Sequence, residues 1–237
     1  MKKRIYFLYI IIIVISACNS DNNYIIDSHE SNVIKVEKNV DSSLVMMIKP
    51  YKDSIEKLMN EILCYNLNNL EKGRPQSTVG NFVTDLCLNY ADADICVMNN
   101  GGLRTNINKG YITRGKIYEL MPFENELVIL ELNKKEYLAL LNYITSRGGE
   151  PFSGCNITMT NNGNIISNSW PVEFDLGKKV KVLTSDYLAN GGDKMAFFKN
   201  KNQNKTGIKV RDAIIDYCMK QDTINIKLDN RIKLYEE

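Results

Sequence analysis

Two aromatic residues, each beside a turn, are the side chains in this sequence best suited to grip a planar ligand. Phe123 lies in the run Met-Pro-Phe-Glu-Asn, and Tyr187 lies in Asp-Tyr-Leu-Ala-Asn-Gly-Gly-Asp. An aromatic ring offers a flat face to another ring, and adjacent glycines let the backbone approach a ligand closely. Taken alone, Phe123 has the simpler interpretation of a core side chain, and the glycine pair that of an ordinary turn.

Two polar residues near these turns, an arginine and an aspartate, have the chemistry to orient such a ligand. Asn99 opens the run Asn-Asn-Gly-Gly-Leu-Arg, directly after an apolar segment, and Arg104 closes it. The guanidinium of Arg104 suits a phosphate or a sugar hydroxyl, or is simply solvated. Asp193 ends the second glycine turn, where a carboxylate accepts hydrogen bonds from ligand hydroxyls or caps the turn. The glycine spacing matches neither a dinucleotide fingerprint nor a phosphate-binding P-loop.

Metal-assisted hydrolysis has no obvious set of ligands in this sequence. The 237 residues include one histidine, His29, which lies in a polar N-terminal stretch. The five cysteines after Cys18 form no Cys-x-x-Cys pair, so a zinc site is not expected. Asp92 and Asp94 are better interpreted as solvated turn carboxylates. We therefore predict no metal-binding and no catalytic residue in this chain.

Composition indicates a globular protein without an affinity for nucleic acid. Apolar residues make up 44% and charged residues 24% of the sequence, and the formal net charge is +2. A nucleic-acid-binding protein typically concentrates Lys and Arg on one face. No dense basic cluster occurs beyond the N-terminal leader.

The N-terminus has the pattern of an export signal. Three basic residues precede the apolar run Ile5–Ile15, which is too short for a comfortable membrane span. The following Ile-Ser-Ala-Cys resembles a bacterial lipobox, which predicts that Cys18 is lipidated and becomes the mature N-terminus. The alternative is an ordinary signal peptide with an incidental cysteine. Lipidation would anchor the protein to a membrane outside the cytoplasm, in the cell envelope.

This pattern predicts three parts: a signal peptide over residues 1–18, a polar tether over 19–40 and one folded domain over 41–237. Within the domain, apolar periodicity and turn residues predict alternating helices and strands. The expected class is therefore α/β (α+β), a single mixed-sheet domain with flanking helices. Helices are expected from Asp41, with Pro50 kinking the helix or delaying its start, and over Thr78–Asn89, Arg114–Leu120, Lys134–Thr145 and Lys209–Met219; extended segments are expected over Ile62–Tyr65, Ile95–Met98, Glu126–Leu132, Ile157–Thr160, Ile165–Ser167, Val180–Ser185 and Ile224–Leu234.

Together, the ordered motifs resemble the C-terminal, substrate-binding domain of the 5′-nucleotidase family. The similarity spans most of residues 43–237, and it rests on several motifs in a fixed order. They are Arg-Pro-x-Ser-x-x-Gly-Asn at Arg74–Asn81, Asn-Asn-Gly-Gly-Leu-Arg at Asn99–Arg104, the Gly-x-Ile-Thr to Pro-Phe-x-Asn run at Gly110–Asn125, the Tyr187 motif at Asp186–Asp193, and Asp-Asn-Arg-Ile at Asp229–Ile232.

The resemblance implies a role in ligand binding for five residues. Phe123 and Tyr187 match the two aromatics that sandwich the nucleobase in that family. Asn99 matches an asparagine that contacts the base, and Arg104 matches an arginine that binds ribose or phosphate. Asp193 matches the aspartate that holds the ribose hydroxyls.

Two further residues match less closely. An arginine before the second helix contacts the ligand in the family, and Arg74 is the candidate here, although its spacing to Gly80 varies between members. Asn125 is a further candidate contact.

The chain departs from the family pattern in its missing metal ligands. Full-length members place a two-metal phosphoesterase domain before this one, and its metals activate water and stabilise the transferring phosphoryl group. The sequence contains no Gly-Asn-His-[Asp/Glu] or Asp-x-His motif. We therefore expect no cofactor in this chain and divalent ions only in a partner domain.

The leading hypothesis is the substrate-specificity half of a split 5′-nucleotidase, which binds a nucleotide and works with a separately encoded metallophosphoesterase. One alternative is a surface lipoprotein that binds nucleosides without catalysis. A second is a degenerate structural remnant of the family.

Overall fold

The computed structural model describes residues 41–174 and 177–235. The predicted signal peptide, the lipidated Cys18, the tether and His29 lie outside the described residues. A compact unit extends from Met46 to Glu237. Within the described ranges, no helix has the length and apolar character needed to cross a membrane.

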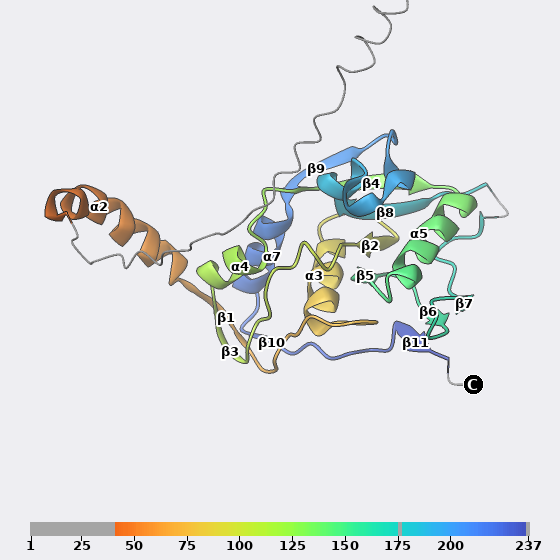
Figure 1. The fold of residues 1–237 in the computed structure, drawn as a ribbon, viewed down its shortest axis with the longest axis horizontal. Helices are drawn as coiled ribbons and strands as arrows, with labels where there is room; N and C mark the ends of the chain where they lie inside the picture. The colour runs from red at the N-terminus through yellow and green to blue at the C-terminus, as the bar shows by residue number, and fades with distance from the viewer. Residues whose placement is uncertain (1–40, 175–176, 236–237) are drawn as a thin grey trace, which may run out of the picture. The chain divides into compact units, whose positions relative to one another are not determined.

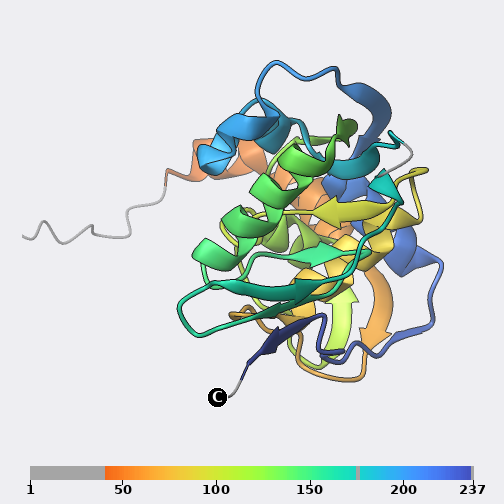
Figure 2. The ribbon, with the colours of Figure 1, turned by 90° about the vertical axis from the view of Figure 1, so that its right-hand side faces the viewer.

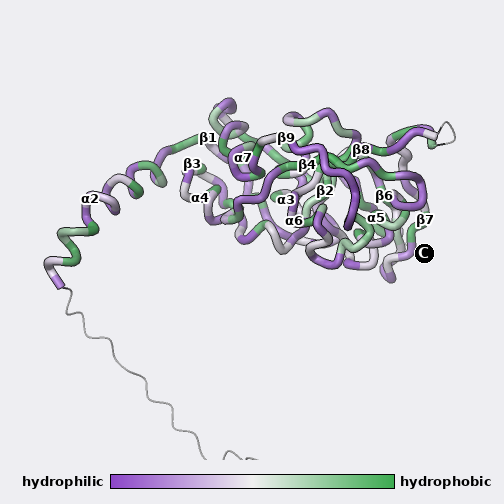
Figure 3. Tube along the Cα trace, turned by 90° about the horizontal axis from the view of Figure 1, so that it is seen from above, coloured by the Kyte–Doolittle hydropathy of each residue, from purple (hydrophilic) through white to green (hydrophobic). Residues whose placement is uncertain are grey.

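The first described helix, α2, runs over Ser42–Met59 and contains Pro50. It begins near the expected position, so the proline does not delay its start. None of its side chains is buried, and apolar residues such as Ile48 and Ile55 are exposed. Figure 3 shows hydrophobic and hydrophilic positions alternating along this helix.

The five-stranded sheet that carries the rest of the unit has the order β5-β2-β8-β4-β9 (Figure 1). β2 and β8 are parallel, and every other neighbouring pair is antiparallel. The strands are β2 (Ile95–Val97), β4 (Glu126–Leu132), β5 (Phe152–Ser153), β8 (Val180–Ser185) and β9 (Asn204–Lys209).

Both faces of this sheet are buried. Successive side chains of a strand point to opposite faces, and all three residues of β2 are buried. Ile95 and Val97 belong to the core cluster that includes helix α5 (Lys134–Ser146). The alternate residues Cys96 and Met98 belong to the cluster that includes the helices of the other face. Figure 2 shows the helices layered against the sheet. The helices of that second face are α3 (Thr78–Leu88), α4 (Arg114–Leu120) and α7 (Val210–Met219).

Two small sheets complete the described part. In the first, β1 (Ile62–Asn66) pairs with β3 (Gly110–Thr113) and β10 (Thr223–Ile224). In the second, β6 (Ile157–Met159) pairs with β7 (Ile165–Asn168) and β11 (Ile232–Leu234). β6 and β7 overlap the predicted extended segments Ile157–Thr160 and Ile165–Ser167, and they pair antiparallel. The mixed sheets with flanking helices confirm the predicted fold class.

Arg231, directly before β11, joins the end of the chain to the core. It is almost fully buried, and its two terminal nitrogens lie 2.8 Å from the two carboxylate oxygens of Asp85 on α3. It also donates to the carbonyl oxygen of Phe152 on β5 at 2.7 Å and pairs with Asp229. This arginine therefore ties β11 to both a helix and the edge of the central sheet.

We expect Arg231→Met to lower the free energy of unfolding by roughly 2–4 kcal/mol, because it leaves a buried carbonyl without a donor and two carboxylates without their partner. Denaturant unfolding monitored by circular dichroism measures the change. Lys233→Met, at an exposed position of β11, is the matched control and is expected to have little effect. Equal effects of the two substitutions would contradict this role.

Candidate functional site

The topology of the central sheet brings three loops to the same end of its strands. Since β2 and β8 are parallel, the residues after them, from Met98 and from Asp186, leave the sheet on the same side. β4 is antiparallel to β8, with Leu127 opposite Ser185, so the residues before β4 also lie there. Ligands of open α/β sheets bind outside the carboxyl ends of such strands.

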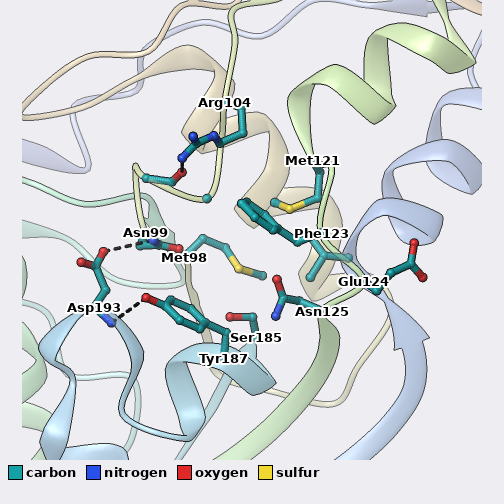
Figure 4. Close-up of a pocket in the computed structure, with 13 residues that line it drawn as sticks. Met98, Asn99, Arg104, Met121, Phe123, Glu124, Asn125, Ser185, Tyr187 and Asp193 are labelled. Atoms are coloured by element: carbon teal, nitrogen blue, oxygen red, sulfur yellow. Dashed lines mark hydrogen bonds between the residues drawn. The ribbon is translucent and has the colours of Figure 1, made fainter.

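These loops surround a pocket of about 600 Å³ (Figure 4). That volume is in the range of small-molecule sites. All predicted binding residues except Arg74 line it. The complete lining is Met98, Asn99, Gly101, Gly102, Arg104, Met121, Phe123, Glu124, Asn125, Ser185, Tyr187, Asp193 and Val210.

The two aromatic side chains lie on different walls of the pocket, with Met98 between them (Figure 4). Phe123 is 42% exposed and Tyr187 is 49% exposed, whereas Met98 is buried. Large aromatic rings that are exposed around a concave surface are typical of a binding site rather than of a core. Phe123 is therefore a pocket-lining side chain and not a core side chain.

Local packing fixes the Tyr187 ring. Tyr187 lies in the first turn of the short helix α6 (Asp186–Ala189), which the Ser185 side chain caps by accepting from the Leu188 N–H. Its hydroxyl oxygen accepts a hydrogen bond from the Asp193 N–H at 3.1 Å. A Cβ at Gly192 would lie 2.6 Å from the ring, so only glycine leaves room for it there.

A buried arginine holds the wall that carries Phe123. Arg211 on α7 donates to the carbonyl oxygens of Pro122 and Phe123 at 3.2 and 3.3 Å and pairs with Glu124. Asn125 donates its side-chain N–H to Asp186 at 2.8 Å, which joins this wall to the α6 loop. The predicted contact residue Asn125 thus also links the loops that carry the two rings.

The polar wall centres on Asp193. One of its carboxylate oxygens accepts from the Asn99 amide at 3.0 Å, and the other contacts Arg147 at 3.4 Å. Its carbonyl oxygen accepts from the Tyr143 hydroxyl at 2.7 Å. Burial raises the pKa of Tyr143 to about 12, so this hydroxyl stays protonated and donates. A Cβ at Gly102 would approach the Asn99 side-chain oxygen to 2.7 Å, so Gly102 is needed to place Asn99.

Arg104 lies at the rim, with its guanidinium carbon 5.8 Å from the centre of the Phe123 ring. It donates to the carbonyl oxygen of Gly101 at 3.1 Å, and its side chain is otherwise open to solvent. The arginine therefore stands beside one aromatic wall, with donors free for an anionic group.

Arg74 lies behind the pocket rather than in its lining. Its guanidinium contacts the carboxylate of Glu150 at 2.9 Å and the carbonyl oxygens of Arg147 and Gly149. Neither Glu150 nor Arg147 was predicted from the sequence. The sequence feature that could have indicated Glu150 is its position between a glycine pair and Pro151, just before a buried strand.

A model of a known protein family matches this chain. The model of the 5′-nucleotidase C-terminal domain matches residues 57–200, more than half of the chain. The chain belongs to this family.

Several similar proteins are much longer than this chain. The 5′-nucleotidase of Vibrio vulnificus is 26% identical over 172 residues, which are 68% of this chain and 31% of that protein. The apyrase of Tabanus yao is 22% identical, over 81% of this chain and 41% of that protein. The crystal structure of a 5′-nucleotidase precursor from Thermus thermophilus superposes with a TM-score of 0.69 at 27% identity, over 81% of this chain and 43% of that one. This chain therefore spans less than half the length of each.

The metal chemistry expected of full-length 5′-nucleotidases has no counterpart among the described residues of this family member. No group of three or more His, Cys, Asp or Glu side chains in residues 41–174 and 177–235 is arranged to hold a metal ion. The described side chains therefore do not fit a two-metal site.

We expect Gly192→Ala to displace the Tyr187 ring from its position, because the new methyl group would overlap both the ring and the Tyr187 carbonyl oxygen. The crystal structure of the variant shows the displacement directly. Gly73→Ala is the control, since its added methyl would meet only the Gln76 carbonyl oxygen, at 3.1 Å. An unmoved Tyr187 ring in Gly192→Ala would contradict this packing argument.

Proposed function

We propose that this chain binds a nucleoside or nucleotide with its base between Phe123 and Tyr187. The observation that carries the proposal is the pair of half-exposed rings on different walls of one pocket. Stacking on an aromatic side chain contributes about 1–3 kcal/mol per base in single-stranded nucleic-acid binders. Two rings would therefore supply much of the affinity, and they would accept any base.

The polar residues would orient the sugar and the phosphate. The Asp193 carboxylate contacts Asn99 and Arg147, yet each oxygen has a second lone pair with which to accept from a ribose hydroxyl. Arg104 stands beside the Phe123 ring and presents its remaining N–H groups to the pocket rim, where it suits a phosphate.

We further propose that the chain is the substrate-specificity half of a split 5′-nucleotidase. The side chains proposed to bind the ligand line one pocket, except for Arg74, whereas the longer relatives contain a further part that this chain does not match. A separately encoded metallophosphoesterase would supply the divalent ions. This chain would hold and orient the nucleotide, and orientation alone can account for a large part of a catalytic barrier. Lipidation of Cys18 would keep the protein on a membrane in the cell envelope.

The aromatic pair is tested by isothermal titration calorimetry of the full chain with adenosine and AMP. We expect Tyr187→Ala and Phe123→Ala each to weaken binding about tenfold or more, because each removes one stacking face. Tyr187→Phe keeps the ring and should retain most of the affinity. Tyr111→Ala, which removes an exposed ring on β3, is the control for unspecific loss. Full affinity in the alanine variants would contradict the clamp.

The split-enzyme proposal is tested by mixing the chain with each metallophosphoesterase that the same organism encodes separately, and measuring phosphate release from AMP. We expect the mixture to be active where each protein alone is not, and Asp193→Asn to lower the activity. Chelation of divalent ions should abolish activity of the mixture but leave calorimetric binding to this chain intact. Tight nucleoside binding without activity in any mixture would instead support ligand capture without catalysis.

A further inference from the structure

A single buried carboxylate lies behind the polar wall of the pocket. Glu150 is only 3% exposed, and no solvent reaches its side chain. One oxygen accepts from Arg74 at 2.9 Å and from the Nε of Arg147 at 2.7 Å. The other oxygen accepts from the backbone N–H of Asn100 at 2.6 Å. A buried carboxylate is stable only when it is paired and hydrogen-bonded in this way.

These contacts tie together segments that are far apart in the sequence. Arg74 precedes α3, Asn100 follows β2, and Arg147 follows the last residue of α5. Through Arg147, which also contacts the Asp193 carboxylate, the network reaches the second glycine turn. Through Asn100 it reaches the neighbouring Asn99. Asn99 and Asp193, the two side chains of the polar wall, are therefore each connected to Glu150 through one intervening residue.

The two contacts of Arg147 are unequal. Its Nε lies 2.7 Å from Glu150, whereas its terminal nitrogen lies 3.4 Å from Asp193. The arginine is thus anchored on the buried carboxylate and reaches outward to Asp193. Because Asp193 has a left-handed backbone conformation, with φ at 51°, its orientation depends on such outside contacts.

We propose that Glu150 is a positioning residue for the ligand's ribose: through Arg147, it holds the Asp193 carboxylate in the orientation that accepts hydrogen bonds from the sugar hydroxyls. This inference rests on the proposed nucleoside-binding function and adds a residue that does not line the pocket. Glu150 acts on sugar recognition, whereas stacking of the base on Phe123 and Tyr187 does not depend on it.

The test is calorimetric titration of the full chain, in mild detergent, with adenosine and with dideoxyadenosine, which lacks the two secondary hydroxyls of ribose. Glu150→Gln keeps the shape but loses the charge and one acceptor. We expect it to weaken adenosine binding at least about fivefold and to change dideoxyadenosine binding by less than about twofold. Glu131→Gln, an exposed carboxylate on β4 paired with Lys179, should change neither.

A second variant covers the case in which Glu150→Gln fails to fold. Arg147→Met leaves Glu150 paired with Arg74 and Asn100 but cuts its link to Asp193, so it should also reduce the preference for adenosine. If both variants fold, their effects should not add, since they interrupt one connection.

Two outcomes would overturn the inference, and they are distinguishable. If the wild-type chain prefers adenosine but folded Glu150→Gln and Arg147→Met keep that preference, the positioning role fails and the proposed function stands. If the wild-type chain binds neither ligand, the proposed function fails, and the role of Glu150 fails with it.

Discussion

The parallel pairing of β2 with β8 is the constraint on which the site depends. Ile95 lies opposite Val182 and Cys96 opposite Leu183, so both strands end at the same edge of the sheet. The antiparallel β4 then contributes its beginning to that edge. Burial of both faces of these strands holds the pairing in place, because a shift by one residue would exchange the side chains of the two cores.

Two buried charged side chains, Arg211 and Glu150, fix the loops next to these strands. Arg211 binds the carbonyl oxygens of the loop that carries Phe123, and Glu150 binds the loop that carries Asn99. Neither Arg211 nor Glu150 lines the pocket, so both hold its loops from outside the lining. The arrangement follows a general requirement of binding sites, in which residues behind the surface set the geometry of those that touch the ligand.

The sequence predicted those parts of the fold whose apolar pattern is strong. Ile95–Met98 and Glu126–Leu132 were predicted as strands because their apolar residues are nearly continuous or alternate. β9, over Asn204–Lys209, was missed because it is a polar strand at the sheet edge, with mostly exposed side chains. The pocket residues were recognised through family motifs, whereas Glu150 was not. Its importance comes from burial beside two arginines that are close only in the folded chain.

In the proposed function, one pocket holds a nucleoside by stacking on one side and by sugar contacts on the other. A crystal structure of the chain with adenosine tests it most directly. We expect the adenine ring between Phe123 and Tyr187, and the ribose hydroxyls within hydrogen-bonding distance of the Asp193 carboxylate. Adenosine bound elsewhere, or with its sugar turned away from Asp193, would overturn the proposed function.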